Sequence, residues 1–181
     1  GFCETRMPRI PYTTPSGAVV QLYPDEEFLY RNAVKIIGGN ASYMRADQVG
    51  TAVGSSSRGI VWCQSDCLQG VNSNTQVGSP SAPVALVIDG ETTNHAQIFG
   101  LVFMRDKNAT MSATTGGAAQ FKFNAQSSVF GSVIIQGVVP TGSGGGLIYG
   151  DRDILRRLND PAVQPPQYDT LGGGWTDRIS Y

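Results

Sequence analysis

The sequence predicts a mainly β protein, built as a β-solenoid-like stack of short strands with a short N-terminal helix and a C-terminal capping helix. The first observation is a repeat: the motif at residues 98–104 (IFGLVFM) recurs 31 residues later, in similar form, at residues 129–135 (VFGSVII). Each motif follows another short apolar strand, at residues 84–90 and 120–124. Repetition at such a period is typical of stacked units that bury one continuous core.

Composition supports the same fold class. Charged residues make up only 15% of the chain, and 23 of its 181 residues are glycine, a mixture that favours strands and turns over helices. The length fits one domain, which we expect to divide into a lead-in (1–59), a β-solenoid core (60–150) and a capping helix with a tail (151–181).

Charge and hydropathy exclude two classes of function. A net charge of −1 removes the broad positive field that non-specific binding to nucleic acid or membranes needs. No run approaches the roughly 18 apolar residues that would span a bilayer, and the first residues lack the apolar core of a signal peptide. We therefore expect a soluble chain, or the soluble portion of something longer.

The lead-in begins with a proline-rich arm at residues 1–24 that ends in one strand, because its prolines forbid a helix. Residues 24–27 (PDEE) then offer a helix start, followed by apolar residues at helical spacing up to Ile37. A strand at residues 33–37 is the alternative. Residues 40–57 are polar and rich in Gly and Ser, which predicts a loop outside the core.

The core begins with a strand at residues 60–63 and ends with a last strand at residues 147–150, with a polar loop expected at residues 107–117. We expect Phe99 and Phe130 to lie one above the other, because their motifs are one repeat apart. The residues expected in the core are Trp62, Val87, Phe99, Val102, Phe121, Phe130, Ile134 and Ile148.

The C-terminal part changes character. Residues 151–159 combine a possible Asp cap, apolar residues at helical spacing and basic residues in the last turn, which predicts a short helix. Such a helix suits a capping role over the open end of the stack. Trp175, in a glycine-rich tail, is expected to pack back on the body.

Three cysteines allow one disulfide at most. Cys63 and Cys67 can pair only if residues 64–66 turn, because a straight strand would hold them about 13 Å apart. Ser65 and Asp66 favour such a turn, and the disulfide would imply an oxidising compartment. The alternative is two reduced thiols beside Trp62. We expect no metal site, since the chain has one histidine and no second Cys pair.

Residues that carry chemistry are sparse. His95 lies in an expected turn, where a solvent-facing or turn-bonded role outweighs a catalytic one. Four carboxylates follow predicted strands and would suit a polysaccharide-active β-helix enzyme or a Ca²⁺ site if they converged, although Asx turns are the simpler interpretation. These carboxylates are Asp89, Glu91, Asp106 and Asp151.

Two further motifs give no clear functional signal. Residues 142–146 (GSGGG) lack the Lys-Ser/Thr that follows in a phosphate-binding loop. Arg152, Arg156 and Arg157 form a basic cluster, which is either a contact for a partner or nucleic acid or a solvated helix face. The sequence thus indicates no catalytic residues and no cofactor.

Several segments together resemble the C-terminal part of the PilX-like type IV pilus assembly proteins, which are minor pilin-like components. The resemblance covers roughly residues 60–181. It is carried by residues 60–62 (IVW), 78–90 (GSPSAPVALVIDG), 98–103 (IFGLVF), 151–158 (DRDILRRL) and 174–177 (GWTD).

The resemblance implies a non-enzymatic structural or adhesive domain at the pilus tip or in its initiation complex. Such a domain would face the periplasm and then the exterior, anchored in the inner membrane before assembly. Its partners would be other pilus subunits, with a host surface, a carbohydrate or DNA as possible ligand. Membrane contact would occur only through a hydrophobic N-terminal helix, which this chain lacks. Alternatives are a carbohydrate-active or carbohydrate-binding β-helix protein, a DNA-binding subunit in DNA uptake, and a solenoid that forms filaments end to end.

Overall fold

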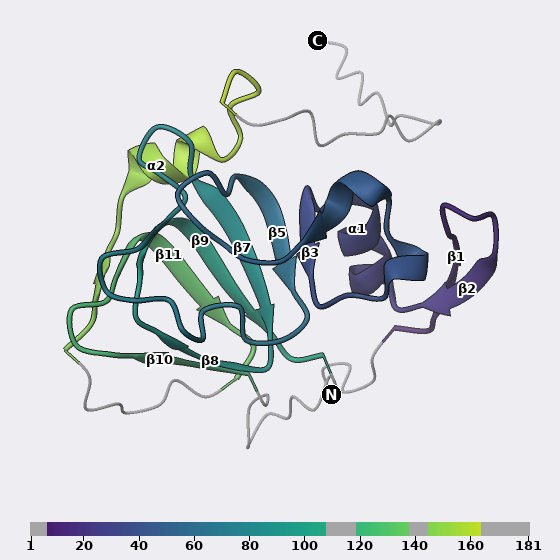
Figure 1. Ribbon diagram of the computed structural model, residues 1–181, viewed down its shortest axis with the longest axis horizontal. Helices are drawn as coiled ribbons and strands as arrows, with labels where there is room; N and C mark the ends of the chain where they lie inside the picture. The colour runs from purple at the N-terminus through teal and green to yellow at the C-terminus, as the bar shows by residue number, and fades with distance from the viewer. Residues whose placement is uncertain (1–6, 108–118, 138–144, 164–181) are drawn as a thin grey trace, which may run out of the picture.

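The computed structural model describes residues 7–107, 119–137 and 145–163, and shows a mainly β protein organised around a parallel sheet (Figure 1). The strand order in this main sheet is β12-β11-β9-β7-β5-β3-β4, with β6 also paired to β9, and every neighbouring pair is parallel. Its longer strands are β5 (Gly59–Cys63), β7 (Val84–Asp89), β9 (Gln97–Arg105) and β11 (Ser128–Ile135). The shorter ones are β3 (Lys35–Ile37), β4 (Val49–Gly50), β6 (Gln76–Val77) and β12 (Leu147–Tyr149).

A second, two-stranded sheet faces the main one. It pairs β8 (Glu91–Asn94) with β10 (Gln120–Phe123), also in parallel (Figure 1). Apolar residues of both sheets, such as Leu86 and Phe121, belong to the same buried cluster, so the space between the sheets is the main core. Their burial supplies the largest stabilising contribution to the fold.

The two Phe-Gly motifs occupy neighbouring strands in register. Phe99 is opposite Phe130 and Gly100 is opposite Gly131 in the β9–β11 pair. The two phenyl rings stack with centroids 4.8 Å apart, and Tyr149 of β12 continues the stack at 4.9 Å. The prediction that Phe99 lies above Phe130 is therefore confirmed.

The N-terminal region differs from expectation. The arm holds a hairpin of two strands, β1 (Ile10–Thr13) and β2 (Val19–Leu22), where one strand was expected. Helix α1 spans Pro24–Asn32 and gives way to β3 (Lys35–Ile37), which pairs with β5. The expected helix is thus too long, because residues 35–37 gain more by joining the sheet.

Residues 40–57 are also more ordered than the expected loop. They form two 3₁₀ turns, η1 (Ala41–Tyr43) and η2 (Ala46–Gln48), and a short strand β4 (Val49–Gly50). Gln48 is fully buried, and its Nε2 donates hydrogen bonds of 2.8 Å to the carbonyls of Tyr30 and Ala33. These bonds satisfy carbonyls that the end of α1 leaves without a helical partner.

The outer face of the main sheet is covered only in part. A second buried cluster joins α1 and the hairpin to a row of aligned residues: Ile36, Trp62 and Val87 are buried in it, and Phe103 packs against it. Ile134 is next in this row and is 49% exposed, because the cover ends before β11.

Six of the eight expected core residues lie inside. Five of these are buried and Phe130 is half-buried: Trp62, Val87, Phe99, Val102, Phe121 and Phe130. Ile134 and Ile148 are corrections. Ile148 aligns with the buried Ile98 and Val129 but is 50% exposed, because in the described residues β12 is the last strand of its edge.

Helix α2 (Arg152–Arg157) starts at Asp151, whose carboxylate accepts hydrogen bonds from the backbone N–H groups of Asp153 and Ile154. The helix packs against β11 and β9 (Figure 1). Ile154 is its buried residue. The expectation of a cap over the end of the stack is therefore not met, since the residues of β12 stay exposed. Most of the expected 107–117 loop, residues 142–144 and Trp175 lie outside the described residues.

Candidate functional site

A buried ion pair lies at the ends of two neighbouring strands. Asp89 ends β7 and Arg105 ends β9, and the parallel register places them side by side. Arg105 donates from Nε to Oδ1 at 2.7 Å and from Nη2 to Oδ2 at 2.6 Å. The side chains are only 3% and 4% exposed, so this is a bidentate charge pair shielded from water.

Trp62 and burial set the electrostatics of this pair. The indole Nε1 of Trp62 donates to Oδ1 of Asp89 at 3.1 Å, and the guanidinium carbon of Arg105 lies 5.2 Å from the indole centroid. Burial opposes the charge on Arg105 and lowers its pKa, but the hydrogen bonds and charges of Asp89 and Asp25 outweigh that effect. The pKa of Arg105 is consequently raised above its ordinary value.

The same arginine connects the sheet to helix α1. Its Nη1 donates to Oδ2 of Asp25 at 2.7 Å, and the carboxylate of Glu26 lies 3.9 Å from Nη1. Both acids lie in the first turn of α1, where carboxylates are favoured by the helix dipole. Arg105 thus fixes the position of α1 over the strand ends.

Aromatic side chains form one wall of the site. Tyr30 of α1 meets Trp62 edge to face with ring centroids 4.9 Å apart, and Tyr43 of η1 meets Tyr30 at 5.5 Å. The hydroxyl of Tyr30 accepts a 2.8 Å hydrogen bond from Nε2 of Gln64. Burial raises the pKa of Tyr30 above its ordinary value.

These groups surround a cavity of about 220 Å³, which we call the Trp62 pocket. Its inner part is formed by buried side chains, while Glu26, Gln64 and Lys107 lie nearer the solvent. The residues that line it are Leu22, Glu26, Tyr30, Tyr43, Trp62, Gln64, Asp89, Arg105 and Lys107. Five of the nine lining residues are polar or charged, so the pocket is more polar than the mainly apolar sites that usually bind small molecules.

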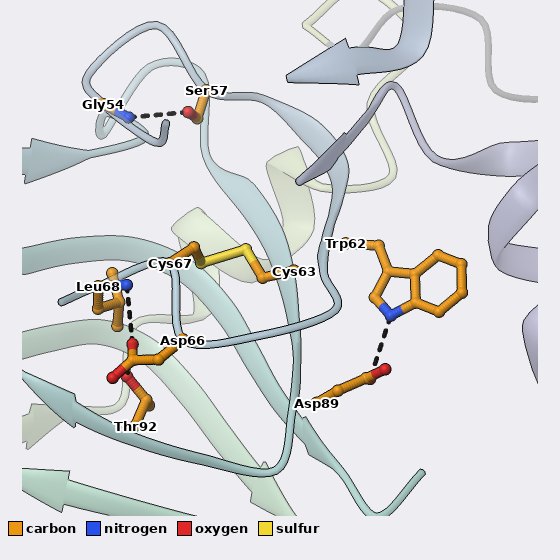
Figure 2. The surroundings of a disulfide bond; sticks show 9 residues. All are labelled: Gly54, Ser57, Trp62, Cys63, Asp66, Cys67, Leu68, Asp89 and Thr92. Atoms are coloured by element: carbon orange, nitrogen blue, oxygen red, sulfur yellow. Dashed lines mark hydrogen bonds between the residues drawn. A yellow bond between two sulfur atoms is a disulfide. The ribbon is translucent and has the colours of Figure 1, made fainter. Parts of the chain in front are cut away.

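A disulfide lies beside the pocket. Cys63 follows Trp62 directly and is bonded to Cys67, with the Cα atoms 5.8 Å apart. Figure 2 shows the disulfide on one side of β5 and Trp62 with Asp89 on the other. Oδ1 of Asp66 accepts hydrogen bonds from the N–H of Leu68 and from Oγ1 of Thr92, so the turn after β5 is held to β8 (Figure 2).

The four carboxylates that follow strands do not converge. Asp89 alone reaches the pocket; Glu91 forms a surface ion pair with Lys122 at 3.6 Å, and Asp151 caps α2. Asp106 is buried, and its backbone N–H donates to the side chain of Gln136. Within residues 7–107, 119–137 and 145–163, no three His, Cys, Asp or Glu side chains are placed to hold a metal ion.

The remaining expected site residues lie elsewhere. His95, between β8 and β9, contacts the side-chain amide of Asn124 through Nδ1. Arg156 pairs with Asp153 at 3.6 Å, and Arg157 donates to the carbonyl of Pro80. Arg152 begins α2 and is exposed. The three arginines thus share one short helix, and none of them lines the Trp62 pocket.

Sequence reasoning missed most of the pocket. It singled out Asp89 and Trp62, but not Arg105, because no motif links positions 16 residues apart. A signal was present: residues 84–89 (VALVID) and 100–105 (GLVFMR) are apolar runs of equal length that end in opposite charges. In neighbouring parallel strands such ends meet. Tyr30 and Tyr43 carried no comparable signal.

The comparisons with known proteins found no similar protein. Neither the models of protein families, nor curated proteins, nor solved structures gave a match to this chain. None of the described helices is long and apolar enough to cross a membrane.

Proposed function

We propose that this chain is a β-solenoid domain that acts without catalysis, as a structural or adhesive component of a type IV pilus at the tip or in the initiation complex. It would work through contacts with other pilus subunits. The observation that carries the proposal is the end of the parallel stack at β12, which no strand of the described residues extends and whose three residues are all about half exposed. The resemblance of residues 60–181 to PilX-like proteins supplies the pilus setting.

The in-register repeats support the solenoid part of the proposal. Aligned rows run across β7, β9 and β11, and the stack of Phe99, Phe130 and Tyr149 continues to the last strand. A stack of this kind normally ends in a polar or covered unit, because an open apolar edge invites pairing with another chain. Among the described residues no strand pairs with the outer edge of β12.

The chemistry of the chain supports the location and the absence of catalysis. The Cys63–Cys67 disulfide fits an oxidising compartment such as the periplasm or the exterior. Both oxygens of Asp89 accept hydrogen bonds from Arg105, so this carboxylate is poorly placed to transfer protons as a glycosidase acid would. The arginines of α2 are partly engaged within the protein, which weakens the DNA-binding alternative.

The test is to locate the protein in the cells that make it. The gene is expressed with an epitope tag, surface fibres are sheared off, and the fibre, membrane and cytosolic fractions are probed. We expect the chain in the fibre fraction and expect Ile148→Asp, which places a charge on the open strand, to remove it from that fraction. Val19→Asp, on the hairpin, is the control because Val19 is also exposed and apolar.

Two results would contradict the proposal. One is a protein confined to the cytosol, where neither pili nor stable disulfides occur. The other is equal recovery of wild type, Ile148→Asp and Val19→Asp in the fibres, since the open strand would then have no part in assembly. Circular dichroism of the purified variants checks that each one is folded.

A further inference from the structure

We propose that β12 binds one extended segment of a partner pilus subunit, which joins the main sheet as a parallel strand and places an aromatic residue over Tyr149. The surface that receives it consists of Leu147, Ile148 and Tyr149, and we call it the β12 edge. Binding of this kind, in which a peptide adds a strand to a sheet, combines backbone hydrogen bonds with side-chain contacts. It rests on the proposed function only for the source of the segment.

Exposed apolar side chains gather at this end of the sheet. The three residues of the β12 edge and Ile134 of the neighbouring β11 are all about half exposed. They are four of the eight large apolar side chains that are exposed in the described residues. Residues 145–150 (GGLIYG) contain no charge and no proline, which are the features that usually protect an edge strand from pairing. The β12 edge is therefore a surface on which another uncharged strand can pair.

An aromatic row specifies one residue of the segment. Phe99, Phe130 and Tyr149 stack with centroids 4.8 and 4.9 Å apart and with interplanar angles of 8° and 9°. The exposed fraction is 8% at Phe99 and 46% at Tyr149, where the row ends. Among the described residues no further ring stacks on Tyr149. A ring from a partner would extend the row by the same favourable contact.

A second row specifies the neighbouring residue. Ile98 and Val129 are buried side by side in the core, and Ile148 is the next member of their row. An apolar side chain placed beyond Ile148 would be removed from water in the same way, which is favourable. The segment therefore carries an apolar residue followed directly by an aromatic one, as β11 does at Val129 and Phe130.

Backbone hydrogen bonds specify the direction of the segment. One bond of 3.0–3.1 Å recurs at each step of the sheet: from the N–H of Gln97 to the carbonyl of Thr75, of Ser128 to Ala96, and of Leu147 to Ser127. The next bond in this series would run from the segment to the carbonyl of Gly146. Every neighbouring pair in the main sheet is parallel, and only a parallel segment repeats the same evenly spaced pattern.

A second copy of the chain fits the β12 edge less well than such a segment. Head-to-tail stacking of copies would bring β4 to the edge, and β4 is only Val49 and Gly50, without an aromatic side chain. Two β12 edges related by a two-fold axis would either run antiparallel or exchange the faces of the sheet, so they could not extend the parallel rows. These mismatches favour a different subunit as the partner.

The experiment titrates the full 181-residue chain with a synthetic peptide that copies residues 126–133 (QSSVFGSV), because this part of β11 already contacts β12. Lysines added at the peptide's C-terminal end keep it soluble, and NMR of the isotope-labelled chain follows binding. The control peptide carries Phe130→Ser. The chain variant is Tyr149→Ser, and its matched control is Phe28→Ser, since Phe28 on α1 is also an exposed aromatic residue. Circular dichroism checks that both variants are folded.

We expect saturable binding that shifts the amide signals of the β12 edge. The control peptide and Tyr149→Ser should each weaken binding about tenfold, through the lost ring stacking and apolar burial. Phe28→Ser should leave the Kd unchanged. A nitroxide at the peptide's N-terminus should broaden the amide signal of Gly146 more than that of Gly150, because the strands run parallel.

Five results would each overturn the inference. Three concern affinity: no saturable binding by the full chain, equal binding of the two peptides, or equal losses in Tyr149→Ser and Phe28→Ser. The fourth is stronger broadening at Gly150, which would mean an antiparallel segment. The fifth is self-association of the wild-type chain that Tyr149→Ser abolishes, since a second copy would then occupy the edge.

This result is separate from the pilus test. Peptide binding is measured on the purified chain, whereas assembly is measured in fibres from cells. A chain that enters fibres but does not bind the peptide contradicts only the strand addition, and one that binds the peptide but never enters fibres contradicts only the pilus setting.

Discussion

Replacing Gly100 by alanine tests the close stacking of the strands at one atom. The φ angle of Gly100 is 142°, a conformation that residues with a side chain rarely adopt. A Cβ built there would lie 1.9 Å from the carbonyl oxygen of Val84 in the neighbouring strand. No side chain can move aside to relieve this contact, because the obstacle is backbone of the adjacent strand. A Cβ built at Gly131 would lie at the same distance from the carbonyl oxygen of Gly100.

The expected cost follows from two contributions. Strained backbone conformations cost roughly 1–3 kcal/mol, and forcing an extra methyl group into packed structure costs about as much. Together they should lower the free energy of unfolding by about 4 kcal/mol, which at a urea m-value of roughly 2 kcal/mol per molar shifts the midpoint by about 2 M.

The assay is urea unfolding followed by circular dichroism, with Gly150→Ala as the control. A Cβ at Gly150 would meet no atom within 4 Å, so its midpoint should stay close to that of the wild type. Equal midpoints for Gly100→Ala and Gly150→Ala would refute the stacking of β7 on β9 at this point.

Three other perturbations have expected outcomes. Reduction of the Cys63–Cys67 disulfide should lower the free energy of unfolding by about 2 kcal/mol, because the closed loop is short, and thiol titration with urea unfolding measures it. Arg105→Met should lower the free energy of unfolding by about 3–5 kcal/mol, because it leaves the buried carboxylate of Asp89 without its partner. Urea unfolding of the double variant Arg105→Met, Asp89→Leu should show that much of this loss is restored, and no recovery would contradict the pairing. Burial raises the pKa of Tyr12 and Tyr30 above 10.0, so the folded state keeps these protons to a higher pH than the unfolded state does. The free energy of unfolding should therefore fall as the pH rises above about 10. Tyrosinate absorbance and thermal unfolding measure this, and a loss of stability that occurs only below about pH 10 would have another cause.

The repeated strands could be read from the sequence because the signal is local. Each Phe-Gly motif is a short apolar run, and two copies 31 residues apart define which residues face each other, so Phe99 could be placed above Phe130. The length of α1 could not be read in the same way. Its end depends on Gln48, which is distant in sequence and bonds the carbonyls of Tyr30 and Ala33.

The sequence pattern also could not predict which apolar residues at the edges of the sheet are buried. Ile134 and Ile148 have the same local character as their buried neighbours, and only the extent of the covering elements makes them exposed. The Trp62 pocket was missed for a related reason. Its side chains come from residues as far apart as Leu22 and Lys107, and only the packing of α1 on the strand ends brings them together.

The most direct test of the proposed function is site-specific photo-cross-linking in cells that make the full protein. A photoreactive residue replaces Ile148 on the last strand β12, Val49 on the opposite edge of the sheet, or Val19 on the hairpin. All three native side chains are exposed. The account predicts cross-links to another pilus subunit from position 148 and none from position 19. Cross-links from both position 148 and position 49 to other copies of the same chain would indicate end-to-end filaments instead. Absence of any cross-link from position 148, with cross-links from position 19, would contradict the open strand as the assembly surface.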